Sequence, residues 1–192
     1  AIDAYLPAIG ILAESINASI HHTELSISMF LFGFALGQLC FGPLSDRLGR
    51  KPVLLSGLVV FMLASLMITT ADSLTSLLVW RFIQALGGGA CVVNSAAIVR
   101  DCFSGREAAK VMSTMAMIMM LAPLVAPAVG SLLLHIAGWW LIFVFLAVYA
   151  GFLFWLLGTR LPETRDINLP AASPRQVIRN YASVLRHKEG MG

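Results

Sequence analysis

Gly42-Pro43-Leu44-Ser45-Asp46-Arg47-Leu48-Gly49-Arg50-Lys51-Pro52 is the stretch that decides the fold, because it places four charges in eleven residues between two long apolar runs. The two glycines permit close backbone approach or positive φ, and Pro52 suits the first turn of a following helix. The stretch is therefore predicted to be a tight loop on a membrane surface. An ordinary polar turn carrying positive-inside charge is the alternative interpretation.

The composition is that of an integral membrane protein. Of 192 residues, 58% are hydrophobic and only 12% are charged, and the mean hydropathy is +0.84. The net charge of +3 does not indicate nucleic-acid binding, because the basic residues flank apolar runs instead of forming a patch with interleaved aromatics. The three cysteines fall in or beside the apolar runs and suggest neither a disulfide framework nor a metal site. We therefore expect no metal and no cofactor.

Five apolar stretches are each long enough to cross a hydrocarbon core of about 30 Å. They cover residues 24–44, 52–71, 75–99, 107–134 and 139–159. Residues 1–12 are too short to span a bilayer, which takes about 20 apolar residues, and are predicted to be the outer end of a truncated first helix. Residues 160–192 are predicted to be a linker carrying a basic amphipathic helix, with a flexible linker as the alternative.

The orientation follows from the basic residues, because cytoplasmic loops retain Lys and Arg. Twelve of the 13 fall in alternate links and in the polar tail, so these segments are expected on the cytoplasmic side. The remaining base, Arg81, lies inside a predicted span.

Two charged residues are predicted within the membrane. Counted from the outer helix ends, Asp3 lies about 13 Å deep and Arg81 about 10 Å deep. Because intramembrane charges are costly and usually functional, we expect the two to form a proton-coupling pair. A helix-end Asp3 and a structural, snorkelling Arg81 are the alternatives. Tyr5, Gln84 and Asn94 are assigned to a substrate cavity beside them.

The 107–134 span combines methionines with two prolines. Met112, Met115 and Met119 form a helical stripe of flexible side chains suited to a promiscuous pocket, so Met115 and Met119 are assigned to the substrate cavity. Lipid-facing or core packing is the alternative for each. Pro123 and Pro127 lie four residues apart, and each removes a backbone donor, so a bend is expected there.

Several segments resemble, in order, motifs of the major facilitator superfamily. The 42–52 stretch is similar to the loop between the second and third helices, and Arg81, Gln84 and the following glycines resemble the fourth-helix motif. Residues 121–130 resemble the fifth-helix antiporter signature, with Ala122 in place of its usual glycine. Residues 160–165 resemble the Pro-Glu-Thr exit of the sixth helix, and Asp3 before Pro7 is similar to the first-helix motif of drug:proton antiporters.

The resemblance implies an all-α integral membrane protein, the N-terminal six-helix half of a major-facilitator fold of the Bcr/CflA (bicyclomycin-resistance) type. It implies proton-coupled export of small, drug-like molecules across the bacterial inner membrane by alternating access. Expected partners are the substrate, protons, the lipid bilayer and a C-terminal six-helix half. The implied gating loop and helix-bend motif comprise Gly42, Asp46, Arg47, Gly49, Arg50, Pro123, Pro127 and Gly130. In the gating loop, Asp46 would be the latch.

Other functions stay open. A metabolite exporter or symporter of the same superfamily carries the same motifs, and a non-transporting fragment of such a protein is a further alternative. A membrane enzyme is disfavoured, because the four histidines, His21, His22, His135 and His187, do not form a metal-ligand spacing and no Ser-His-Asp arrangement is apparent.

Overall fold

The computed structural model describes residues 2–165, and within that range every regular element is a helix. The elements are α1 (Ile2–Tyr5), η1 (Leu6–Ala8), α2 (Ile9–Ser15), α3 (Ile20–Leu48), α4 (Arg50–Ile68), α5 (Leu74–Cys102), α6 (Gly105–Ala137) and α7 (Trp139–Arg160). Helices α3 to α7 are long and apolar enough to cross a membrane. The all-helical membrane fold expected from the sequence is confirmed. The expected amphipathic helix of the linker lies outside the described residues.

The stretch at residues 42–52 was predicted to be a tight loop, but all of it except Gly49 is helical. Helix α3 continues through Gly42, Pro43 and Asp46 to Leu48, and α4 begins at Arg50. Gly49 alone separates them, with φ at 104°, a conformation that side chains other than glycine rarely adopt. The charges mark where the chain leaves the apolar layer, whereas the helix itself continues until a residue with positive φ ends it.

The first helical segment is interrupted near its middle. Pro7 lies in the 3-10 turn η1, between the single turn of α1 and the longer α2. Proline fixes φ and cannot donate a backbone hydrogen bond, so an α-helical ladder is weakened at this point. The segment ends at Ser15, three residues beyond the predicted end, and a turn with Asn17 at φ 52° leads into α3.

Helix α5 lies at the centre of the bundle, and three consecutive glycines adapt it to its neighbours. A Cβ on Gly87 would lie 2.5 Å from the carbonyl oxygen of Gly57 in α4, and one on Gly89 would lie 2.5 Å from that of Phe34 in α3. Gly88, between them, lines a hollow instead. Small residues therefore let α5 approach both partners closely, as is common between membrane helices.

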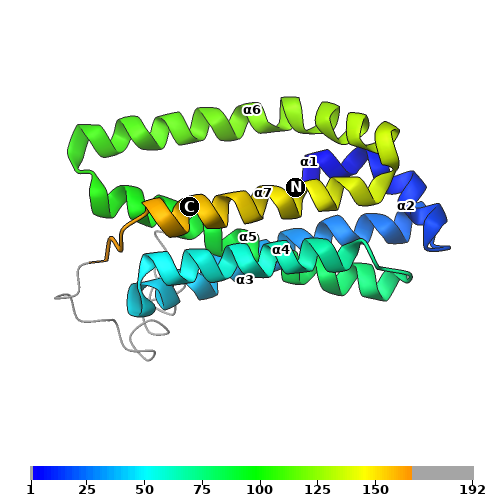
Figure 1. Cartoon of the computed structure of the whole chain (residues 1–192), viewed down its shortest axis with the longest axis horizontal. Coiled ribbons are helices and arrows are strands. Elements are labelled where there is room, and N and C mark those ends of the chain that lie inside the picture. Colours follow the sequence, from blue (N-terminus) through cyan, green and yellow to red (C-terminus); the bar gives the residue numbers. More distant parts are fainter. Residues whose placement is uncertain (1, 166–192) are drawn as a thin grey trace, which may run out of the picture.

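Helix α6 lies at the outside of the bundle (Figure 1). A Cβ on Gly130 would clash with the Ala4 carbonyl oxygen, so α1 and α6 touch near that glycine. The middle of α6 is far more open: Met120 is 77% exposed and Leu124 is 74% exposed. The helix is continuous through Pro123 and Pro127.

Candidate functional site

Arg81 is the most deeply buried charged residue described, with no exposed surface. Its Nη1 donates a hydrogen bond of 2.8 Å to Oε1 of Gln84, one turn further along α5. Nε2 of Gln84 in turn donates to the hydroxyl of Ser65 at 2.7 Å. Ser65 belongs to α4, so this chain of polar groups ties the arginine to a second helix.

Three aromatic rings surround the Arg81 guanidinium. Its central carbon lies 4.5 Å from the ring centroid of Tyr5, 4.7 Å from that of Phe30 and 5.7 Å from that of Phe143. These distances are typical of cation–π contacts, which gain strength where water is excluded. The rings belong to α1, α3 and α7, and the Tyr5 and Ser26 hydroxyls share a hydrogen bond of 3.0 Å. We call Tyr5, Phe30 and Phe143 the aromatic cage.

Asp3 and Arg81, the predicted proton-coupling pair, form no direct ion pair among residues 2–165. Asp3 lies two residues before Tyr5, and two residues of an α-helix are about 200° apart around its axis. Because Tyr5 points at Arg81, Asp3 points elsewhere. Depth in the membrane was predicted from helix ends, but depth does not fix the direction in which a side chain leaves its helix.

Asp3 lines a hollow of about 460 Å³ within the bundle. We call it the inner hollow. Its lining is almost entirely apolar and comprises Ile2, Asp3, Phe30, Leu31, Phe34, Leu58, Phe61, Gly88, Cys91, Val92, Met119, Ala122, Pro123, Leu146, Tyr149 and Leu153. Two assigned residues, Met119 and Pro123, are therefore brought together with Asp3.

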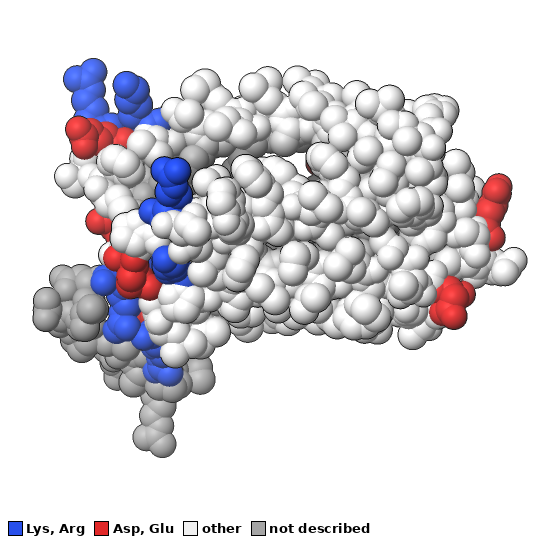
Figure 2. All heavy atoms as spheres, viewed as in Figure 1, with Lys and Arg blue, Asp and Glu red and all other residues white. Residues whose placement is uncertain are grey.

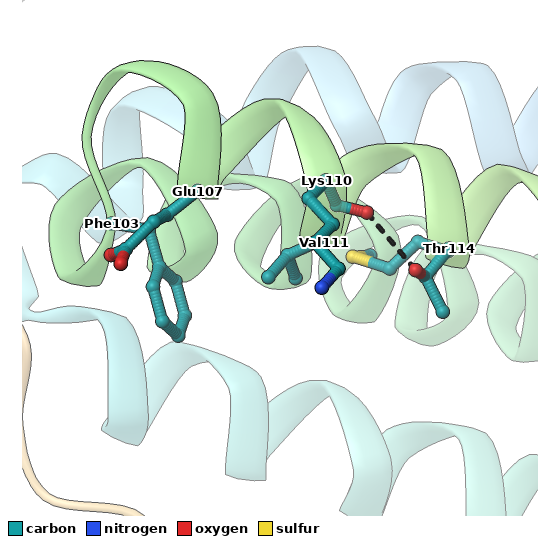
Figure 3. A pocket seen from close by; sticks show the side chains of 6 residues that line it. Phe103, Glu107, Lys110, Val111 and Thr114 are labelled. Atoms are coloured by element: carbon teal, nitrogen blue, oxygen red, sulfur yellow. Dashed lines mark hydrogen bonds between the residues drawn. The ribbon is translucent and has the colours of Figure 1, made fainter.

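Other residues assigned to a substrate cavity lie elsewhere. Tyr5, Gln84 and Asn94 have no exposed surface and do not line the inner hollow, because close packing of α5 against its neighbours encloses them. Asn94 donates to the Ala90 carbonyl at 2.7 Å, and its Oδ1 has no hydrogen-bond partner among the described residues. Met115 lines a separate open groove near the start of α6, beside Lys110, Val111 and Thr114 (Figure 3).

Charged side chains gather at one end of the bundle. In Figure 2 the visible Lys and Arg lie at the end where α3 leads into α4, whereas the opposite end of this face shows acidic residues only. Arg50 links three helices there: Nη1 pairs with Asp46 of α3, and Nε lies 3.0 Å from Oδ2 of Asp101 in α5. Nη1 also donates to the Ser45 hydroxyl at 2.7 Å. We call this region the charged end.

Glu163 fastens the exit of α7 to the start of α4. Its carboxylate accepts hydrogen bonds from the backbone N–H of Arg50 at 2.8 Å and of Lys51 at 3.2 Å, which are orphan donors of the first helical turn. It also accepts from the N–H groups of Thr164 and Arg165. Partial burial raises the pKa of Glu163, but the four N–H donors together outweigh it and hold that pKa below its ordinary value.

The comparison with known families agrees with this geometry. Residues 1–189 match the model of the Major Facilitator Superfamily. The chain belongs to the major facilitator superfamily. It is accordingly a multi-pass membrane protein, and the fold class and family expected from the sequence are confirmed.

Curated relatives of this major-facilitator chain carry drug-resistance names. It is 34% identical to a bicyclomycin resistance protein homolog of Haemophilus influenzae, covering 100% of the chain and 48% of the relative. It is 37% identical to a chloramphenicol resistance protein of Pseudomonas aeruginosa, over 85% of the chain and 39% of the relative. It is 36% identical to the multidrug resistance protein MdtL of Escherichia coli, over 91% of the chain and 44% of the relative. The chain spans about half the length of the curated relatives it matches.

Sequence reasoning about this major-facilitator chain missed two acids of the charged end. Asp101 was not singled out, although an acid after a long apolar helix, on the same side as Arg50, is a signal for an ion pair. Glu163 was noted only within its Pro-Glu-Thr exit. Helix α4 starts after Gly49, which has no side chain to cap it. This lack of a local cap was the signal that another residue, here Glu163, caps the helix.

Proposed function

We propose that this chain is the N-terminal half of a proton-coupled exporter of small, drug-like molecules in the bacterial inner membrane. The observation that carries the proposal is a carboxylate, Asp3, in an apolar hollow whose wall includes Phe30, a residue of the cage around the buried cation Arg81. A charge at mid-helix costs about 2.5–3.5 kcal/mol on insertion scales, so such residues persist where function requires them. Relatives named for drug resistance support export as the direction.

In this proposal Asp3 carries the proton. Apolar surroundings favour the neutral acid, whereas a nearby cation favours the carboxylate. Asp3 lines the inner hollow, and Arg81 lies in the same bundle. A change in the bundle that exposes Asp3 to Arg81 or to water would release the proton, and the reverse change would favour uptake.

The charged end is proposed to act as the cytoplasmic gate. Arg50 joins α3, α4 and α5 through Asp46, Ser45 and Asp101, so these helix ends move together. The Asp46 side chain is 49% exposed, which leaves it accessible to the second half of the transporter. There its negative charge would be stabilised by a helix N-terminus, as we infer from the partial positive charge of such ends.

The experiment is drug efflux driven by an imposed pH gradient, measured on the full-length transporter in proteoliposomes with chloramphenicol as the probe. Asp3→Asn removes the titratable group and should abolish gradient-driven efflux while the protein still binds the probe. The control is Asp72→Asn, which changes an exposed acid in the link between α4 and α5 and should leave efflux unchanged. Undiminished efflux by Asp3→Asn would contradict the proposal.

A further inference from the structure

The open groove near the start of α6 is separate from the inner hollow. It has a volume of about 460 Å³ and shares no lining residue with that hollow. Phe103, at the C-terminal end of α5, forms one wall. The rest of the lining belongs to α6 and comprises Glu107, Lys110, Val111, Thr114 and Met115 (Figure 3). We call it the interface groove.

The interface groove lies where α6 enters the apolar layer. Helix α6 has 33 residues and is therefore about 50 Å long, whereas the hydrocarbon core of a bilayer is about 30 Å thick. The ends of the helix thus extend into the headgroup layers. Lys110 is the last Asp, Glu, Lys or Arg of α6, so the helix is uncharged from Val111 to its final turn. The groove therefore spans the level at which lipid headgroups meet acyl chains, in the leaflet at the charged end.

Two opposite charges lie at the rim of this groove without a partner. Glu107 and Lys110 are exposed, and residues three apart lie on one side of a helix. Figure 3 shows both side chains on the side of α6 that borders the groove. Within residues 2–165, no ion pair joins either of them to another residue. Both are available to a ligand that carries one charge of each sign.

The order of these groups along α6 matches one kind of headgroup. From the end of the helix inward, α6 presents Glu107, then Lys110 about 4.5 Å deeper, then the half-buried Val111 and Met115. In a phospholipid with an ethanolamine headgroup, the ammonium lies outermost, the phosphate lies beneath it and the acyl chains follow. The ammonium would donate to the Glu107 carboxylate, and the phosphate would accept from the Lys110 ammonium. The reverse order of charges would place like beside like.

We propose that the interface groove binds phosphatidylethanolamine from the leaflet at the charged end. The primary ammonium of this lipid has N–H groups to donate to Glu107, whereas the quaternary ammonium of phosphatidylcholine has none. Phosphatidylglycerol carries only the negative charge, so it would satisfy Lys110 and leave Glu107 unpaired. The groove therefore favours the ethanolamine lipid over both. This inference does not depend on the proposed role of Asp3 in proton transport.

Native mass spectrometry of the purified full-length transporter tests the binding, with phosphatidylethanolamine, phosphatidylcholine and phosphatidylglycerol of identical acyl chains as probes. Wild type should bind the ethanolamine lipid about fivefold more tightly than the other two, the size expected for one exposed charge pair. Glu107→Gln should abolish this preference, because the carboxylate is the partner of the ammonium. Lys110→Gln should weaken the binding of all three lipids, because each carries a phosphate.

Arg106→Gln is the matched control. It removes an exposed base next to Glu107 that does not line the groove, and it should leave the binding of all three lipids unchanged. Glu107→Lys combined with Lys110→Glu keeps both charges but reverses their order, so this double variant should lose the preference. The proposal is overturned if wild type shows no preference for the ethanolamine lipid or if the double variant keeps that preference. It is also overturned if Arg106→Gln weakens binding as much as Lys110→Gln.

Discussion

At the scale of single residues, Arg81 shows how a cation is accommodated inside an apolar bundle with no acid among residues 2–165 paired to it. It combines one charge-assisted hydrogen bond, to Gln84, with three aromatic rings that face the positive charge. Because the site excludes water, each of these interactions is stronger than it would be on a surface. The same surroundings make the loss of any one partner costly.

Gln84 gives a direct test of this arrangement. Gln84→Leu keeps the side chain's bulk but leaves Nη1 of Arg81 and the Ser65 hydroxyl without their partner. Leaving a buried charged donor unsatisfied should lower the free energy of unfolding by about 1.5–3 kcal/mol. Thermal unfolding in detergent measures the loss. The control is Thr70→Ala, an exposed hydroxyl at the end of α4 bonded to the Met67 carbonyl, which should change stability little.

At the scale of elements, the N-terminus of α4 is held by a residue that follows α7. Glu163 replaces the local cap that Gly49 cannot supply, and the close fit explains the glycine. A Cβ at position 49 would lie 2.5 Å from Oε2 of Glu163. Two helices distant in sequence are thereby joined at the charged end, through hydrogen bonds that require an ionised carboxylate.

The lowered pKa of Glu163 gives this cap a definite pH dependence. Its stabilising contribution is fully present above the ordinary glutamate pKa of 4.5 and is lost as pH falls through the lower folded value. Hydrogen-exchange protection of the Arg50 and Lys51 amides should therefore fall at acid pH. In Glu163→Gln protection should be low at every pH, whereas Glu107→Gln, an exposed acid in the first turn of α6, should behave as wild type. Equal protection in Glu163→Gln would rule out the cap.

The sequence predicted the helices better than it predicted their contacts. Apolar runs locate α3 to α7, because crossing a membrane requires about 20 apolar residues. The length of each run can be read from its own segment without reference to the others. The helix ends were less visible, since Asp46 and Arg47 are polar yet helical. Asp3 and Arg81 make no direct ion pair among residues 2–165, and the sequence could not foresee this because the direction of a side chain about its helix axis depends on packing. The cage and the Glu163 cap join residues far apart in sequence, which single-segment patterns do not reveal.

At the scale of the whole molecule, the two ends of the bundle differ in charge. The charged end carries the basic residues visible in Figure 2, and because Lys and Arg are retained in cytoplasmic loops we propose that this end faces the cytoplasm. The middle of α6, with Met120 and Leu124 largely exposed, contributes an apolar face.

Cysteine labelling tests this orientation in the full-length protein, with the native cysteines replaced. A membrane-impermeant maleimide added outside intact cells should label Ser15→Cys, at the end of α2, and should not label Ser104→Cys, just before α6. Both serines are exposed, so permeabilised cells should show labelling at each. Labelling of Ser104→Cys in intact cells would reverse the assigned orientation.

Proton release on substrate binding is the most direct test of Asp3 as the proton carrier, because it does not require transport. The full-length transporter is held in weakly buffered detergent solution with a pH indicator, and chloramphenicol is added as the probe. Wild type should release protons on binding, whereas Asp3→Asn should bind the probe and release none. Proton release by Asp3→Asn equal to that of wild type would show that Asp3 is not the proton carrier.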